Sequence, residues 1–445
     1  MTQVTFFNRL QKDGGSRFGC SGKSSLVSEM PDHNTKDGAK DQFTAFHRAM
    51  RVLLICGQCV GLNPVLGILE NDVSKVRFSF ISWRFLYSIV LGVAQLIITC
   101  LCLYMLSNSL TIKGLGFLSF SLSTCVSSFL FIRIATQWPY LLKCITSSRL
   151  DTYIDPTIVR RCYIATSLLM GLAVCKYEIS RAMYCSTNKT GLYEDFIRLS
   201  FPWLYDLDVP YNMPSGIMIQ YINISATINW NYSDIFVVCV SLYLTSVFKQ
   251  INKKIVQAVE KSFLPSSLWG SLREDYTRAA RLVRLFDDIF SSVVLLSFAS
   301  NLFFICLQLF NILTFGGDCT QYPSPHLYPP LLLSINSRSF VGIEQAIYLA
   351  YSVVFLFCRF LAVSLVAAGV HSAAQAPAAA MYNIPASAYS KEVQRFLDQV
   401  HSDGVALSGL QFFYITKEMV LSVAGTIVTY ELVLLQFNSE ELNKL

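Results

Sequence analysis

The sequence predicts an all-α membrane protein with seven transmembrane helices, and three observations carry this prediction. First, 53% of the 445 residues are hydrophobic and only 14% are charged, whereas soluble domains usually carry about 25% charged residues. Second, the apolar residues gather into runs long enough to cross a bilayer. Third, the basic residues lie unevenly on the two sides of these runs. Lipid is therefore the solvent that suits this composition.

The predicted spans are mainly apolar runs of about 20 residues or more, the length that crosses the hydrocarbon core. The fifth and sixth runs exceed the bilayer thickness, so we expect them to tilt or to extend into the cytosol. The stretch 48–69 is expected to form an interfacial or re-entrant helix, and 391–413 an amphipathic helix outside the membrane. The seven predicted spans are 83–106, 112–137, 160–184, 228–250, 286–315, 339–370 and 418–437.

The placement of Lys and Arg predicts an inverted topology, with a cytosolic N-terminus and an extracellular C-terminus. In this orientation the inner segments hold 26 of the 35 Lys and Arg residues, and the outer segments hold five. Cytoplasmic loops carry such an excess of basic residues. The opposite orientation, that of G-protein-coupled receptors, would place the eight basic residues of 249–285 outside.

This topology divides the chain into three parts. Residues 1–44 mix Gly, Ser, Lys and Asp, which predicts a disordered cytosolic tail. Residues 45–438 form the helical domain, and residues 439–445 form a short extracellular tail. The Asn-X-Ser/Thr sequons lie at or beside the predicted outer loop between the third and fourth spans, so Asn188 and Asn223 are candidate glycosylation sites.

Polar and aromatic side chains gather toward the outer half of several spans. Aromatic faces beside carboxylate and amide groups suit a polyhydroxylated ligand, because rings stack on C–H faces while polar groups bond to hydroxyls. Alternatively, the aromatic residues form an interfacial belt, and Glu178 with Arg181 forms an ordinary ion pair on one helix. The candidate ligand-binding residues are Glu178, Trp230, Asp234, Asn301, Gln308, Tyr348 and Tyr351.

Charged residues within the spans need partners. Arg359 lies deep in the sixth span, and Asp288 and Glu431 are possible partners that the sequence leaves open. Asp287 and Asp288 lie near Arg281 and Arg284, which predicts a structural ion-pair cluster at the inner start of the fifth span.

The last predicted span carries a mildly polar stripe. Ser422, Thr426, Thr429, Val433 and Gln436 are spaced by four, three, four and three, which places them on one face of a helix. Such a stripe suits the wall of a narrow aqueous path. It equally suits a helix–helix seam built from small and hydroxyl side chains.

Other site chemistries find little support in the sequence. No motif of a hydrolase, a phosphate-binding loop or a dinucleotide fold occurs, so an enzyme is not expected. The five His residues are scattered, which predicts no metal site, and no basic run suits nucleic acid. Cys185 and Cys319 are the only cysteines in the long predicted outer loops, which makes them a candidate disulfide pair.

The last span ends in TYELVLLQF at 429–437, where Thr-Tyr and Gln-Phe enclose five residues that are apolar except for Glu431. This pattern resembles the signature of insect gustatory receptors. The flanking segments GLQFFYITKEMVLSVAGTIVTYELVLLQF, FDDIFSSVVLLSFASNLFFICLQLF and NWNYSDIF are similar to the sugar-sensing branch of that family. The resemblance runs from about residue 45 to 438 and is strongest after 228.

The resemblance implies the insect chemoreceptor fold, which has seven helices in inverted topology. It also implies a ligand-opened cation channel that assembles as a homotetramer or with related subunits, with an outward-facing sugar pocket in each subunit. The helix 418–437 would line the pore, and the ligand pocket would open outward between helices of a single subunit. No cofactor is implied. Pore and gate residues would be Thr429, Val433, Gln436 and Phe437.

The leading functional prediction is thus a sugar-gated, non-selective cation channel in the plasma membrane of taste neurons. One alternative is a seven-helix G-protein-coupled receptor for a small polar ligand, which a cytosolic N-terminus and an outside C-terminus would exclude. The other alternative is a transporter. Transporters often show paired broken helices related by an internal repeat, and we find no such self-similarity.

Overall fold

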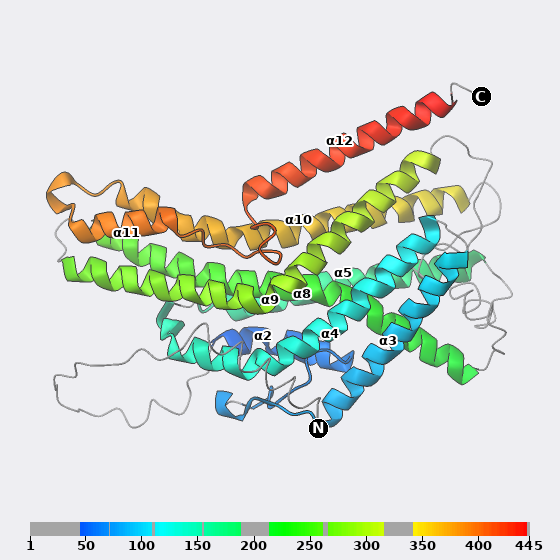
Figure 1. The fold of residues 1–445 in the computed structure, drawn as a ribbon, viewed down its shortest axis with the longest axis horizontal. Coiled ribbons are helices and arrows are strands. Elements are labelled where there is room, and N and C mark those ends of the chain that lie inside the picture. Colours follow the sequence, from blue (N-terminus) through cyan, green and yellow to red (C-terminus); the bar gives the residue numbers. More distant parts are fainter. Residues whose placement is uncertain are drawn as a thin grey trace. The chain divides into compact units, whose positions relative to one another are not determined.

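A computed structural model describes residues 45–70, 72–108, 112–153, 155–187, 213–260, 266–315 and 341–442. These residues belong to one compact unit, Thr44–Leu445, and most of them form long helices (Figure 1). The elements are α2 (Ala45–Cys59), β1 (Val65–Leu66), η1 (Val73–Lys75), β2 (Arg77–Phe78), α3 (Trp83–Asn108), α4 (Ile112–Ser147), η2 (Leu150–Tyr153), α5 (Ile158–Thr187), α8 (Met213–Glu260), α9 (Ser266–Phe315), α10 (Val341–Met381), η3 (Ala386–Ala388), α11 (Lys391–Ser402) and α12 (Lys417–Leu442).

Six helices are long and apolar enough to cross a membrane, namely α3, α4, α5, α8, α9 and α10. Each contains most or all of one of the first six predicted spans, so the predicted helical membrane architecture is confirmed to that extent. The helix α12 covers the seventh predicted span but is not among the six found within the described residues. The seventh span and the orientation of the chain stay predictions.

The helix α8 lies at the centre of the packed helices. In its most apolar stretch 78% of the residues are buried, against 28% in α3. It contacts α4, α5, α9 and α10, whereas α3 exposes apolar side chains such as Val90, Leu96 and Ile97. An exposed apolar face of this kind suits contact with lipid tails. Polar residues on α8 are consequently held away from lipid.

The segment 48–69 is helical only in its first part. The helix α2 ends at Cys59 and is followed by a small antiparallel sheet of β1 and β2, and an interfacial or re-entrant position of this helix stays a prediction. Phe46, Met50 and Leu53 of α2 are fully buried, and the helix contacts α5 and α8. Because its apolar residues recur at helical spacing, α2 buries one face in protein.

The linker between α11 and α12 is fastened to α9. Ser408 donates its backbone N–H and its hydroxyl to the two carboxylate oxygens of Asp287, at 2.6 and 2.7 Å. Arg284 forms an ion pair with Asp403 at 2.6 Å. For Arg284 and Asp287 this corrects the prediction of a local ion-pair cluster. Both residues instead bind a segment more than a hundred positions further along the chain.

Candidate ligand site

Arg359 lies deep in α10, and its guanidinium forms an ion pair with Asp234 of α8. The Arg359 Nε and Asp234 Oδ2 atoms are 2.9 Å apart, and both side chains are 2% exposed. Asp234 is neither of the possible partners, Asp288 and Glu431, between which the sequence could not choose. The two helices pack along each other, which brings Asp234 to the arginine. An isolated guanidinium at this depth would be costly, so this pairing explains how the span accommodates it.

Three neutral side chains complete the hydrogen bonding of this pair. Arg359 donates to Asn231 Oδ1 at 2.8 Å and to Asn301 Oδ1 at 2.5 Å. The Asn301 Nδ2 atom lies 3.1 Å from both carboxylate oxygens of Asp234, and the Ser297 hydroxyl also donates to this carboxylate. Asp234 and Asn301, both predicted ligand residues, therefore lie in contact with each other. Their polar groups are, however, bonded to other groups of the protein.

Trp230 covers the guanidinium with its indole ring. The Arg359 Cζ atom lies 3.9 Å from the ring centroid, which is within the range of a cation–π contact. Phe120 of α4 and Phe304 of α9 contact the same ring, with centroids 5.9 and 4.9 Å away. The ion-pair cluster, as we call it, consists of Trp230, Asn231, Asp234, Ser297, Asn301 and Arg359.

Two donors of the predicted ligand set are left without a partner. The buried Trp230 Nε1 and Gln308 Nε2 atoms have no hydrogen-bond partner within the described part of the chain. Burying such groups unpaired costs free energy, so both are candidates to bind a ligand. Tyr351 instead donates to the Leu172 carbonyl of α5 at 3.4 Å.

Several predicted residues lie where the structure describes no side chain. This holds for Glu178 and Cys185 in α5 and for Tyr348 in α10, while Asn188 and Cys319 fall outside the described residues altogether. The contribution of Glu178 and Tyr348 to a ligand site and the disulfide between the two cysteines consequently stay predictions.

Asn223 corrects the glycosylation prediction. Its side chain is 6% exposed and lies in the helical interior of α8. Glycan acceptors are surface residues, so an asparagine buried between helices does not fit that role. The sequon reflects local sequence only, because an Asn-X-Ser motif carries no information about the depth of the residue in the fold.

A second polar network, which the sequence analysis missed, joins α3, α4 and α8. The Asn229 amide donates to Ser128 Oγ at 2.9 Å, and the Ser128 hydroxyl donates to Gln95 Oε1 at 2.9 Å. On its other side, Asn229 Oδ1 accepts from Ser127 at 2.7 Å. The signal was present in the Ser- and Thr-rich run SFSLSTCVSS of α4, which is unusually polar for a membrane helix.

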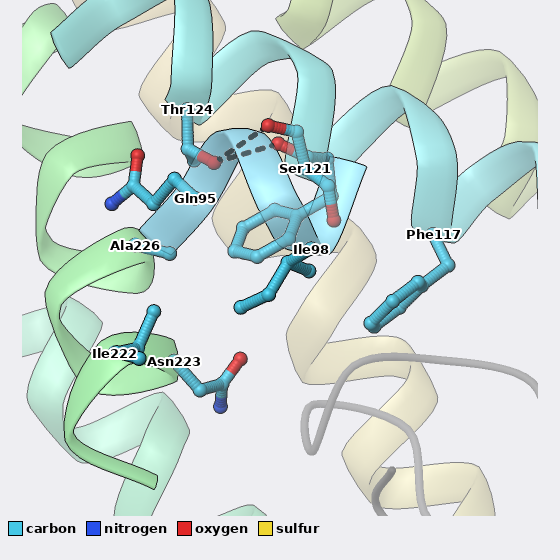
Figure 2. A pocket seen from close by; sticks show the side chains of 9 residues that line it. Gln95, Ile98, Phe117, Ser121, Thr124, Ile222, Asn223 and Ala226 are labelled. Atoms are coloured by element: carbon cyan, nitrogen blue, oxygen red, sulfur yellow. Dashed lines mark hydrogen bonds between the residues drawn. The ribbon is translucent and has the colours of Figure 1, made fainter. Parts of the chain in front are cut away.

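A small cavity lies between α3, α4 and α8, beside this network (Figure 2). Its volume is about 20 Å³, enough for roughly one or two water-sized groups. Gln95, Ser121, Thr124 and Asn223 give it polar walls, and Phe117, Phe120, Ile98, Ile222 and Ala226 give it apolar walls. Because Phe120 also contacts Trp230, the cavity adjoins the ion-pair cluster through one ring.

The predicted pore residues lie on α12. Thr429 and Val433 are exposed, as are Ser422 and Thr426 of the same stripe. The side chains of Gln436 and Phe437 lie outside the described part of the helix. The face of α12 that packs on the rest of the chain carries other residues, including Val420 and Ile427. The structure therefore argues against a seam between the described stripe and another helix of the same chain.

No group of three His, Cys, Asp or Glu side chains among the described residues is placed to hold a metal ion. The ion-pair cluster and the cavity are lined by amides, hydroxyls, aromatic rings and one neutralised charge pair. Such surroundings can bind a neutral, hydrogen-bonding molecule.

Comparison with known proteins identifies relatives along nearly the whole chain. It is 28% identical to gustatory receptor for sugar taste 64a of Drosophila melanogaster, covering 90% of this chain and 86% of that protein. It is also 28% identical to gustatory receptor 5a for trehalose of the same organism, covering 89% and 86%. In structure it resembles the insect olfactory receptor OR5 from Machilis hrabei, with a TM-score of 0.59, 14% identity, and coverage of 88% and 99%.

The structural similarity to OR5 confirms the insect chemoreceptor fold for the described helices. The sequence profile described as Trehalose receptor matches residues 30–322 and 331–445. The matching proteins are receptors rather than enzymes, in agreement with the absence of catalytic motifs. With the profile extending over most of the sequence and the sugar-taste relatives aligned over about nine-tenths of it, the chain belongs to the Trehalose receptor family of insect gustatory receptors.

Proposed function

We propose that the chain is a sugar-gated, non-selective cation channel in the plasma membrane of taste neurons. The observation that carries this proposal is the ion-pair cluster, which joins α8, α9 and α10 beneath an indole ring with an unpartnered donor. The sugar-taste relatives support the ligand class. A neutral polyhydroxylated ligand matches a site whose one buried charge pair is already compensated.

The sugar would bind on the outer side of the ion-pair cluster. Trp230 and Gln308 would donate to sugar hydroxyls, because both have buried donors without partners. Asp234 and Asn301 would act by holding Arg359 and Trp230 in place, since their own polar atoms are engaged. The remaining wall would come from Glu178, Tyr348 and Tyr351.

The pore would form from one α12 helix of each of four subunits. The exposed stripe of α12 supports this arrangement, because its hydroxyl groups and Val433 have no packing role within the described chain. Repetition around a symmetry axis would convert Thr429, Val433, Gln436 and Phe437 into stacked rings. A narrow Val433 ring can block ions by dewetting, and Gln436 dipoles can replace water without selecting one cation.

The helix α9 would connect the two sites. It carries Ser297 and Asn301 in the ion-pair cluster and also Asp287, which binds the linker before α12. At 1.5 Å per residue, Asp287 lies about 15 Å from Ser297 and about 21 Å from Asn301 along the helix. A sugar can open the channel only if it binds the open arrangement more tightly than the closed one. A shift of α9 on sugar binding would move the linker and hence the pore helix.

The proposal is tested by recording membrane currents in cells that lack endogenous taste receptors. The receptor is expressed alone and with related subunits, and trehalose, sucrose and glucose are applied from outside. We expect a sugar-dependent current whose reversal potential changes little when Na⁺ is exchanged for K⁺. Surface-expressed receptor that gives no such current in any combination would refute the proposal.

A further inference from the structure

The cavity between α3, α4 and α8 has the composition of a binding subsite for a neutral hydroxylated group. Its polar walls are Gln95, Ser121, Thr124 and Asn223, each at least nine-tenths buried. Figure 2 shows the Gln95 and Asn223 amides and the Phe117 ring on different sides of the cavity. Among the described residues that line it, none carries an ionisable side chain.

Asn223 supplies the strongest indication of a ligand. Its Nδ2 atom is buried and has no hydrogen-bond partner within the described residues. By contrast, the Gln95 carbonyl accepts from Ser128 and the Thr124 hydroxyl donates to the backbone of its own helix, so these groups are anchored. A buried amide without an acceptor is costly. Asn223 lines the cavity, so a hydroxyl oxygen that reaches its amide would satisfy this donor.

We propose that this cavity binds one hydroxyl-bearing edge of a neutral sugar, with Asn223 donating to a sugar oxygen and Phe120 contacting the adjacent C–H face. This proposal rests on the proposed function and gives it a second contact region, on α3 and α4, which the predicted ligand residues did not include. The volume of about 20 Å³ fits a hydroxyl with its carbon but not a whole pyranose ring.

The same cavity composition excludes charged sugars. A carboxylate or phosphate would lose its hydration on entering, and no cationic side chain lines the described walls to compensate for it. Occupation of the cavity would also be felt at the ion-pair cluster, since Phe120 contacts Trp230 and Trp230 contacts Arg359. The cavity could thus discriminate neutral from charged sugars and change the packing of Trp230 on Arg359 in the ion-pair cluster.

The test measures equilibrium binding of radiolabelled trehalose and glucose to the purified full-length receptor in lipid nanodiscs. Asn223→Leu removes the donor and keeps the branched shape of the side chain, and Ala226→Leu fills the cavity. Ala258→Leu is the matched control, because Ala258 is equally buried on α8 but does not line the cavity. We expect about ten-fold weaker binding for Asn223→Leu, the effect of one lost hydrogen bond. Ala226→Leu should weaken binding in the same direction because its side chain occupies the cavity, and the control should show no change. Glucuronate should not compete with glucose.

Other outcomes separate this proposal from the proposed function. If sugar binding and sugar-evoked currents persist unchanged in Asn223→Leu and Ala226→Leu, the cavity holds water only and this proposal fails, while the proposed function stands. If binding depends on Asn223 but no current follows, the cavity proposal stands and the channel function fails. Should Asn223→Leu not fold, Asn223→Ala removes the same donor with a smaller side chain and must show the same direction of change. A receptor that binds neither sugar overturns both proposals.

Discussion

Neutralising one member of the Asp234–Arg359 pair should destabilise the protein far more than neutralising an exposed ion pair. Asp234→Asn leaves a guanidinium that is 2% exposed without its counter-charge, and Arg359→Gln leaves the carboxylate. Removing one partner of a buried pair costs about 3–5 kcal/mol. Since the net stability of folded proteins is about 5–15 kcal/mol, either substitution should remove a large share of it.

The double variant Asp234→Asn/Arg359→Gln should recover part of this loss. Its two amides are neutral and can still bond to Asn231, Ser297 and Asn301, which surround the pair. Because no uncompensated charge remains, we expect the double variant to be more stable than either single one. The coupling free energy should reach at least about 2 kcal/mol, as for residues in one buried network.

The assay is equilibrium unfolding of the full-length receptor in mixed micelles of mild and denaturing detergent. Glu274→Gln provides the control, because Glu274 pairs with Arg278 at 3.5 Å with side chains 69% and 44% exposed. Exposed pairs contribute at most about 1 kcal/mol. If the Asp234 and Arg359 variants shift no further than this control, or if their effects simply add, the ion pair does not hold the three helices together.

Further predictions concern the ligand, the pore, the linker and the topology. Trp230→Phe, which keeps a ring but loses the unpartnered Nε1 donor, should shift the sugar dose response about ten-fold to higher concentration, and Trp230→Ala should shift it further; a wild-type response with normal surface expression would place the ligand elsewhere. Thr429→Cys and Val433→Cys should react with a water-soluble thiol reagent and change the current only in the presence of sugar, whereas Ile427→Cys, on the buried face, should stay protected; equal protection at all three positions would contradict the pore assignment. Asp287→Ala removes both bonds to Ser408, so sugar binding to the purified receptor should persist while the evoked current falls. Antibody tags should be accessible in intact cells at the C-terminus and only after permeabilisation at the N-terminus, and the reverse pattern would exclude the inverted topology.

The positions of the helices could be predicted from the sequence because hydrophobicity is a local property. The predicted starts at 83 and 112 agree with α3 and α4. The lengths were underestimated for α8 and α9, since these helices continue beyond the apolar stretch into segments with polar faces. An apolar run in the sequence ends where polar and charged residues begin, but the backbone hydrogen bonds of a helix can continue through such residues.

The candidate site was only partly predictable, because its bonds join residues far apart in the chain. Trp230, Asp234 and Asn301 were found as polar or aromatic residues within apolar runs. The sequence could not choose Asp234 as the partner of Arg359, because helix order in space is not encoded in spacing along one helix. For the same reason Asn223 was assigned to a glycan, although the packing of α3 and α4 against α8 buries it.

The magnitudes also constrain how a sugar could open the channel. A ligand with a dissociation constant near 1 mM has a binding free energy of about 4 kcal/mol, and only the difference between its affinities for two states can drive a change. Breaking the Asp234–Arg359 pair would cost about 3–5 kcal/mol, which is about as large as the whole binding free energy. Under the proposed channel function, opening would therefore leave the pair intact and move α8, α9 and α10 together at their point of contact. The remaining freedom lies where the contacts are fewer and more exposed, in α12 with its exposed stripe and in the linker held by Asp287. Sugar binding would accordingly shift α8, α9 and α10 relative to the linker. The ion-pair cluster would keep these three helices in contact during the shift.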